Sequence, residues 1–380
     1  MQKLTGTPRS YPWGSRTLIP ELRGEPTPSS RPEAEVWFGA HPVGSSLIDD
    51  RPLTDIIAED PTAALGERVR TEFGDGLPFL LKLLGAAEPL SLQAHPSAEQ
   101  AREGYERENA QRIPLNAPNR NYPDPSHKPE LIVALTDFHA MVGFRPLDQT
   151  RELFAALHCP ELDRYLTILD PRSEEDSLRG LFTTWITIPS AARTALIDAV
   201  VDAARSELDR GDWISDVLRT VLELQDRYPG DIGVLGALLL NHLVLAPGEA
   251  LYLDAGHLHA YVSMANSDNV LRGGLTSKYV DVPELVRILR FNSVSDPVVT
   301  CVDGEYEVPA REFRLHSWDL APAEAFTFSH DGPAIALCAA GEVQLGNLGL
   351  RPGEAAWIPA SDPTWEVSST EGGQLFIACT

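Results

Sequence analysis

The chain has 380 residues, of which 43% are hydrophobic and 23% charged, so it can bury more than one sizeable core. It carries 31 basic and 55 acidic residues, a formal net charge of −24. This charge argues against nucleic acid or an anionic membrane as the partner, because both are bound through clustered Lys and Arg. A small anionic substrate would need a locally positive pocket.

Cysteine usage and the N-terminal stretch both favour a cytoplasmic protein. The four cysteines are scattered and form no Cys-x-x-Cys pair, which is typical of reduced thiols: Cys159, Cys301, Cys338 and Cys379. Residues 1–10 lack the apolar core of a signal peptide, and no apolar run approaches the ~18 residues of a membrane span. We therefore expect a cytoplasmic location and no membrane segment.

The spacing of apolar residues along the sequence divides the chain into blocks. Up to about residue 147, short apolar runs separated by Pro and Gly predict strands and loops. From about 148 to 228 the spacing becomes helical, with two apolar stripes: Leu196, Ile197, Val200, Val201, Ala204 and Leu208, then Ile214, Val217, Leu218, Val221 and Leu222. A Pro-Gly pair at 229–230 ends this block, and strand-like runs resume at 238–245.

An internal repeat follows. Residues 247–255 read Pro-Gly-Glu-Ala-Leu-Tyr-Leu-Asp-Ala, and residues 352–360, 105 positions later, read Pro-Gly-Glu-Ala-Ala-Trp-Ile-Pro-Ala. We interpret the two copies as equivalent strands of two jelly rolls, against the alternative of two unrelated turns. His259 in the first copy corresponds to Thr364 in the second. A metal site is therefore expected in the first jelly roll and not in the second.

Three short segments supply side chains that bind metal ions. Ser-Leu-Gln-Ala-His-Pro places Gln93 and His95 on one face of a strand, because alternate side chains share a face. Ser-His-Lys-Pro-Glu-Leu offers Glu130, and Gly-His-Leu-His-Ala-Tyr offers His257 and His259. Imidazole, carboxylate and amide oxygen around one divalent ion suit zinc with an open position. Any one of these histidines taken alone is more often structural, and their shared placement at strand ends favours the metal.

Several longer motifs occur in a fixed order along the chain. They read Tyr-Pro-Trp-Gly at 11–14, Ala-Glu-Val-Trp-Phe-Gly-Ala-His-Pro at 34–42, the Gln93–His95 segment, His-Lys-Pro-Glu at 127–130, and Met-Ala-Asn-Ser-Asp-Asn-Val-Leu-Arg-Gly-Gly-Leu-Thr-Ser-Lys at 264–278. From residue 11 to its C-terminus the chain resembles the type I mannose-6-phosphate isomerases, or phosphomannose isomerases. The resemblance implies conversion between mannose 6-phosphate and fructose 6-phosphate through a cis-enediol, and one Zn²⁺ per chain.

The resemblance also implies a mainly β fold of two cupin, or jelly-roll, barrels with an α-helical insertion. The expected parts are a discontinuous catalytic cupin (1–147 and 238–295), the helical insertion (148–237) and a C-terminal jelly roll without a metal site (296–380). On the family pattern the zinc ligands are Gln93, His95, Glu130 and His259, with His257 outside the set. Three of these ligands precede the helical block and one follows it, so they can meet only if the block is an insertion.

Isomerisation requires a base, a group that stabilises the enediolate, and cations that bind the phosphate. Arg272 has a fixed positive charge and suits the enediolate or the phosphate. The other substrate-binding candidates are Lys278 first, then Ser91 and Lys82; the candidates for proton transfer, which the sequence does not rank, are His127, Lys128 and Asp268. The expected partner is thus a small phosphorylated sugar.

The chain departs from the family pattern after His259. The family usually has more residues between Tyr261 and Met264, including an acidic residue where Val262 stands, and a Pro where Ser277 stands. His257 is unusual at its position and is a candidate for an alternative ligand or base.

These departures leave two further hypotheses beside the isomerase. One is a metal-binding cupin without isomerase activity that serves as a sugar-phosphate binder or regulator. The other is an iron-dependent cupin oxygenase. We expect a monomer, with a weak homo-oligomer as the alternative.

Overall fold

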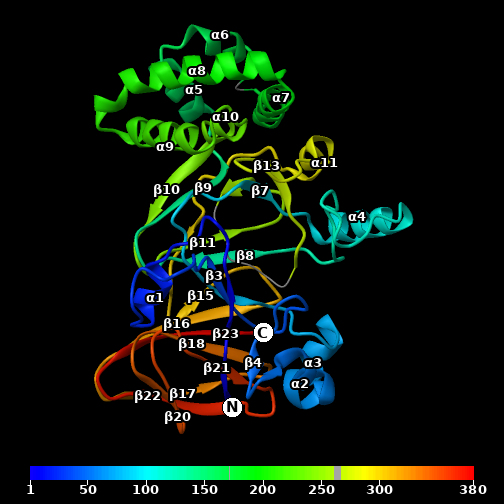
Figure 1. Cartoon of the computed structure of the whole chain (residues 1–380), viewed down its shortest axis with the longest axis vertical. Coiled ribbons are helices and arrows are strands. Elements are labelled where there is room, and N and C mark those ends of the chain that lie inside the picture. The colour runs from blue at the N-terminus through cyan, green and yellow to red at the C-terminus, as the bar shows by residue number, and fades with distance from the viewer. Residues whose placement is uncertain (171, 261–266) are drawn as a thin grey trace.

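The computed structural model of the chain describes residues 1–170, 172–260 and 267–380. The molecule is elongated: a cap of helices lies at one end, one group of sheets lies in the middle, and a second group lies at the other end (Figure 1). In the part of the chain described, no helix combines the length and apolar character needed to cross a membrane. The prediction of a mainly β chain with an α-helical block is confirmed.

Three sheets form the middle of the molecule. Their strand orders are β10-β9-β12-β7-β13, β14-β11-β8 and β2-β3-β6. The strands are β2 (Thr7–Arg9), β3 (Glu35–Phe38), β6 (Leu81–Leu84), β7 (Leu92–Ala94), β8 (Glu130–Val133), β9 (Phe138–Phe144), β10 (Leu240–Leu245), β11 (Ala250–Leu253), β12 (His259–Ala260), β13 (Leu271–Gly274) and β14 (Val298–Val299).

The middle sheets join strands from both sides of the helical block. Strand β9 pairs with β10, β8 with β11, and β7 with both β12 and β13, all antiparallel. The chain therefore leaves the sheets after β9, forms the helices, and returns as β10. This path brings the segment before residue 144 against the segment after residue 240.

The helical block packs on its own apolar core. Its elements are α5 (Leu147–Ala156), α6 (Pro160–Leu166), α7 (Glu174–Ile186), α8 (Ser190–Ser206), the short η1 (Leu208–Arg210), α9 (Trp213–Arg227) and α10 (Gly233–Ala237). The predicted stripes lie on α8 and α9; Leu196, Val200 and Leu218, for example, are buried. Burial of an amphipathic face against a neighbouring helix is what stabilises helices of this length.

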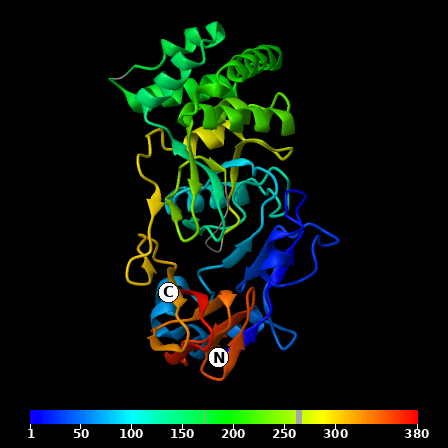
Figure 2. The same cartoon turned by 90° about the vertical axis from the view of Figure 1, so that its left-hand side faces the viewer.

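The far end of the molecule is a pair of sheets, with strand orders β1-β21-β18-β23-β16-β15 and β17-β22-β19-β20. The strands are β1 (Gln2–Leu4), β15 (Glu305–Tyr306), β16 (Arg314–Leu320), β17 (Glu324–Ser329), β18 (Ala334–Gly341), β19 (Val343–Leu345), β20 (Leu348–Leu350), β21 (Ala355–Ile358), β22 (Thr364–Ser369) and β23 (Gly373–Cys379). Strand β1 comes from the other end of the chain, and both termini lie in this part of the molecule (Figure 2).

The internal repeat is confirmed as a structural one. Strand β11 begins at Ala250 and β21 at Ala355, at equivalent places in the two copies. Each is preceded by a glycine with positive φ, Gly248 at 88° and Gly353 at 81°, so the two turns also match. The interpretation as unrelated turns is wrong.

The smaller elements lie beside these sheets. They are α1 (Leu18–Leu22), α4 (Ala98–Ala110) and α11 (Val282–Ile288), and, next to the far sheets, α2 (Leu53–Glu59), α3 (Pro61–Phe73), β4 (Leu47–Ile48) and β5 (Arg51–Pro52) (Figure 1). One hydrophobic core runs from the middle sheets into the far sheets. It contains Val36 and Leu131 from the former and Ile335, Trp357 and Phe376 from the latter.

Candidate metal centre and substrate site

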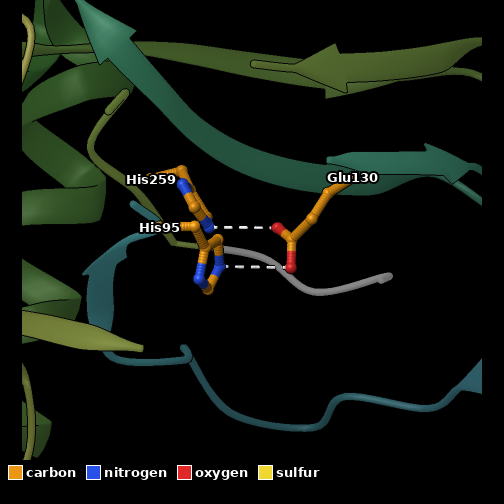
Figure 3. A group of neighbouring side chains, drawn as sticks. All are labelled: His95, Glu130 and His259. Carbon is orange, nitrogen blue, oxygen red and sulfur yellow. Dashed lines mark ion pairs between the residues drawn. The ribbon is translucent and has the colours of Figure 1, made fainter. Parts of the chain in front are cut away.

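Three buried side chains converge inside the middle sheets. His95 follows β7, Glu130 begins β8, and His259 begins β12. Nε2 of His95 lies 3.2 Å from Oε1 of Glu130, and Nε2 of His259 lies 3.2 Å from Oε2 (Figure 3). The three side chains are at most 3% exposed, and their ligand atoms lie within 4.8 Å of one another.

Hydrogen bonds fix the tautomer of both histidines. Nδ1 of His95 lies 2.7 Å from the backbone oxygen of Asn269, and Nδ1 of His259 lies 2.9 Å from that of His257. A carbonyl oxygen only accepts, so Nδ1 carries the proton in each ring. In a neutral imidazole Nε2 then presents a lone pair. Burial lowers the pKa of His95 to about 4, which keeps that ring neutral near pH 7.

The lone pairs of the histidines therefore point at a carboxylate. Burial would raise the pKa of Glu130, but the imidazoles and the Lys128 ammonium, 3.5 Å from Oε1, hold it well below its ordinary value. Where water is excluded, the Nε2 lone pairs and the Glu130 carboxylate repel each other. A cation bound between the two rings and the carboxylate would remove this repulsion. Two imidazoles and one carboxylate form a donor set that suits zinc.

Gln93, Arg272 and His259 lie side by side across three adjacent strands of one sheet. In the sheet register the Cα of Gln93 is opposite His259 on one side and opposite Arg272 on the other. Directly opposed residues of antiparallel strands share a face. Gln93 is thus beside His259 in the sheet, and Arg272 is one strand farther away. Ser91 lies two residues before Gln93, just ahead of β7.

The cationic side chains of Arg272 and Lys278 lie close together beside Gln93. Burial lowers the pKa of Arg272, and burial together with the Arg272 charge lowers the pKa of Lys278. Within residues 1–170, 172–260 and 267–380, neither side chain has a carboxylate at ion-pair distance. Two adjacent cations without an anion are suited to bind a doubly charged anion such as a phosphate group.

Lys82 lies on the other side of the site, on β6. Its Nζ is 3.5 Å from Oε2 of Glu35 and 4.3 Å from the centre of the Trp37 ring. The same Glu35 oxygen accepts a 2.6 Å hydrogen bond from Nε1 of Trp37. Burial lowers the pKa of Lys82 to about 8. A buried ammonium with a pKa near neutrality can carry or release a proton under physiological conditions.

Asp268 is held at the edge of the site by His41 and Asp124. Nε2 of His41 lies 3.5 Å from Oδ2 of Asp268, and this contact lowers the pKa of Asp268. Its backbone N–H donates to Asp124 at 2.9 Å, and Asn269 donates its side-chain amide to the backbone oxygen of Asp124 at 2.8 Å. Asp124 thus fixes the segment whose carbonyl orients His95.

Comparison with known proteins decides which family the chain belongs to. The family model "Phosphomannose isomerase type I, catalytic domain" matches residues 1–147. The mannose-6-phosphate isomerase of Escherichia coli (strain K12) is 38% identical over 389 aligned positions, covering 95% of each protein. The chain belongs to the type I phosphomannose isomerase family.

Relatives of the type I phosphomannose isomerases span distant organisms. The human mannose-6-phosphate isomerase is 33% identical over 318 positions, covering 76% of this chain and 72% of that protein. A solved variant of the phosphomannose isomerase from Salmonella typhimurium superposes with a TM-score of 0.90 and 35% identity, covering 100% and 99% of the two chains. A zinc-bound mannose 6-phosphate isomerase structure superposes with the same TM-score and identity.

The structure places His127 apart from the other family candidates. Nε2 of His127 lies 2.5 Å from Oε1 of Glu312, and the bond to Glu312 raises the pKa of His127. Lys128, the next residue, is 2% exposed and faces Glu130 instead. Adjacent residues of an extended segment point in opposite directions, which separates the two side chains.

Two other observations bear on the departures from the family pattern. His257 offers its backbone oxygen to His259, and its own side chain lies outside the metal group of the described residues. Burial lowers the pKa of this ring. The predicted short turn between Tyr261 and Met264, including Val262, lies outside the described residues.

Sequence reasoning missed three acidic residues that support the site. Glu35 lies inside a quoted motif, and its position two residues before Trp37 was the available signal. Asp124 and Glu312 lie outside every motif and act through contacts across 143 and 185 positions of the chain, so no local pattern pointed to them.

Proposed function

We propose that this chain is a zinc-dependent aldose–ketose isomerase that interconverts mannose 6-phosphate and fructose 6-phosphate through a cis-enediol. The observation that carries the proposal is the buried group of His95, Glu130 and His259, with Arg272 one strand away. Such an arrangement holds a metal ion and an anionic substrate side by side.

The residues that would hold zinc are His95, Glu130 and His259, with the amide oxygen of Gln93 as the fourth ligand. Bound zinc supplies a Lewis acid that polarises a sugar oxygen or acidifies a water. The carbonyls of Asn269 and His257 keep Nδ1 of the two rings protonated, so that Nε2 is available for the ion.

The phosphate group would bind to Arg272 and Lys278, with Ser91, the residue just before β7, as a hydroxyl donor. The protein as a whole carries a net charge of −24, which repels a dianion. A phosphate group therefore needs a place where positive charges are concentrated, and Arg272 and Lys278 supply two of them. Binding the phosphate places the reacting carbons at a fixed distance from the metal group.

Proton transfer between C1 and C2 would involve Lys128 and Asp268. Lys128 is the buried group closest to the metal ligands, and Asp268 stays ionised because His41 lowers its pKa. Lys82 adds a second ammonium beside them, which would stabilise negative charge on the enediolate oxygen. His127 would act on this site indirectly.

We further propose the division expected from the sequence: a catalytic cupin (1–147 and 238–295), a helical insertion (148–237) and a C-terminal jelly roll (296–380). A cytoplasmic monomer, with a weak homo-oligomer as the alternative, completes the proposal. All four cysteines are free thiols, which accords with a reducing compartment.

A coupled assay on mannose 6-phosphate with zinc-loaded protein tests the function. Turnover to fructose 6-phosphate supports the isomerase, whereas binding without turnover would favour a sugar-phosphate binder. Oxygen consumption that depends on Fe(II) and not on zinc would favour the oxygenase. No observation on the described residues favours either of these alternatives over the isomerase.

A further inference from the structure

The segment that leads into β16 reaches the segment that leads into β8 and carries His127 and Lys128. Glu312 lies two residues before β16, and its Oε1 is 2.5 Å from Nε2 of His127. The two side chains are only 16% and 31% exposed. Because His127 directly precedes Lys128, this contact joins the C-terminal part of the chain to the main chain of the proposed site.

Each end of the contact lies in an irregular segment just before a strand. Strand β16 pairs with β23 from Arg314↔Cys379 to Leu320↔Gly373 without a register shift, so Glu312 stands next to a well-anchored strand. His127 lies in a segment without regular structure that enters β8 at Glu130. The contact therefore ties the irregular segment that precedes β8 to the segment that leads into β16.

The charges around the contact favour an ion pair. The bond to Glu312 and the nearby Asp254 raise the pKa of His127, against the effect of burial. Burial would raise the pKa of Glu312, but His127 lowers it below the ordinary value. Tyr252 interacts electrostatically with Glu312 and with Arg290. Arg311 directly precedes Glu312 and donates its backbone N–H to Oε2 of that residue, and Lys128 directly follows His127.

This arrangement has a defined pH range. Because the pKa of His127 is raised, its contribution is lost as pH rises through that raised value. Because the pKa of Glu312 is lowered, its contribution is lost as pH falls through the lowered value. The two groups therefore form an ion pair between the lowered pKa of Glu312 and the raised pKa of His127.

We propose that Glu312 is a positioning residue of the isomerase site: by binding His127 it fixes the main chain on which Lys128 and Glu130 face the metal group. This inference rests on the proposed function. It gives the C-terminal sheets a part in catalysis beyond covering the middle sheets.

The test compares Glu312→Gln with Glu307→Gln, a matched change at an exposed position of the same segment. In Glu312→Gln we expect kcat for mannose 6-phosphate to fall about tenfold, the size of one lost charged hydrogen bond, with zinc content and unfolding temperature close to those of the control. The double variant Glu312→Gln, His127→Asn should be no slower than His127→Asn alone, because both changes remove one contact.

A second readout does not depend on activity. The NMR titration of His127 should have a lower midpoint in Glu312→Gln than in Glu307→Gln. Three results would overturn the proposal. They are an equal kcat in the two single variants, additive losses of kcat in the double variant, and a loss of zinc that accounts for the loss of activity. If the unaltered protein does not convert mannose 6-phosphate, the proposed function fails, and an unchanged His127 midpoint would separately refute the Glu312 contact.

Discussion

Two hydrogen bonds to backbone carbonyls determine what the buried histidines can bind. With Nδ1 of His95 and His259 directed at the oxygens of Asn269 and His257, only Nε2 remains to face Glu130. Substitution of Glu130 would leave two lone pairs and the Lys128 ammonium in a buried space without their anion. The same logic applies to Arg272 and Lys278, whose charges have no carboxylate at ion-pair distance in the described part of the chain.

Arg272→Gln should weaken phosphate binding. We expect KM for mannose 6-phosphate to rise between tenfold and a hundredfold, roughly the worth of one charge-assisted contact, and added inorganic phosphate to inhibit less. Steady-state kinetics with phosphate as inhibitor measure both effects. Arg219→Gln on α9, whose side chain is 55% exposed, is the control. An unchanged KM in Arg272→Gln would remove Arg272 from the proposed phosphate site.

Strand β7 is the element that assembles the site. Its Gln93 lies between His259 on β12 and Arg272 on β13, so one strand sets the distance from the metal group to Arg272, the proposed phosphate ligand. The alternation of Gln93 and His95 could be predicted from the sequence, because period two is a local property. Their neighbours across the sheet could not, because the register depends on how the chain returns after the helical block.

Gly274→Ala should displace β13. Gly274 has φ of 141°, and an added Cβ would lie 2.7 Å from backbone atoms of Gly233 at the start of α10. We expect a loss of about 2 kcal/mol or more in stability and a raised KM, because Arg272 would move with the strand. Denaturant unfolding and kinetics measure these effects.

The control for this change is Gly76→Ala, where an added Cβ meets nothing within 4 Å. Similar stability and KM in the two variants would show that the close approach of α10 and β13 does not position Arg272.

At the scale of the whole molecule, the N-terminal segment links the far sheets to the middle sheets. Strand β1 pairs with β21, Gln2 opposite Trp357, although the next strands of the chain belong to the middle sheets. The equivalence of β11 and β21 could be predicted because the two copies of the repeat have similar amino-acid sequences. The pairing of β1 with β21 spans most of the chain, and the contact of Glu312 with His127 spans about half of it. Neither could be predicted, because no local sequence pattern marks such distant partners.

Leu4→Ala tests whether β1 stabilises the whole protein. Leu4 is 2% exposed and packs in the core shared by the middle and far sheets. We expect a loss of about 2–5 kcal/mol on unfolding, the usual range for a buried leucine. Gln2→Ala on the same strand, at an exposed position, should have little effect in the same denaturant titration. Equal stability of the two variants would mean that β1 is peripheral.

The central claim is that His95, Glu130 and His259 hold the zinc ion that isomerisation requires. A crystal structure of the zinc-loaded protein, with anomalous scattering measured at the zinc edge, tests it most directly. We predict one zinc peak at about 2.0–2.2 Å from Nε2 of both histidines and from a carboxylate oxygen of Glu130. In Glu130→Ala we predict the loss of both the peak and the turnover of mannose 6-phosphate. Full turnover by protein without zinc among these three side chains would contradict the account.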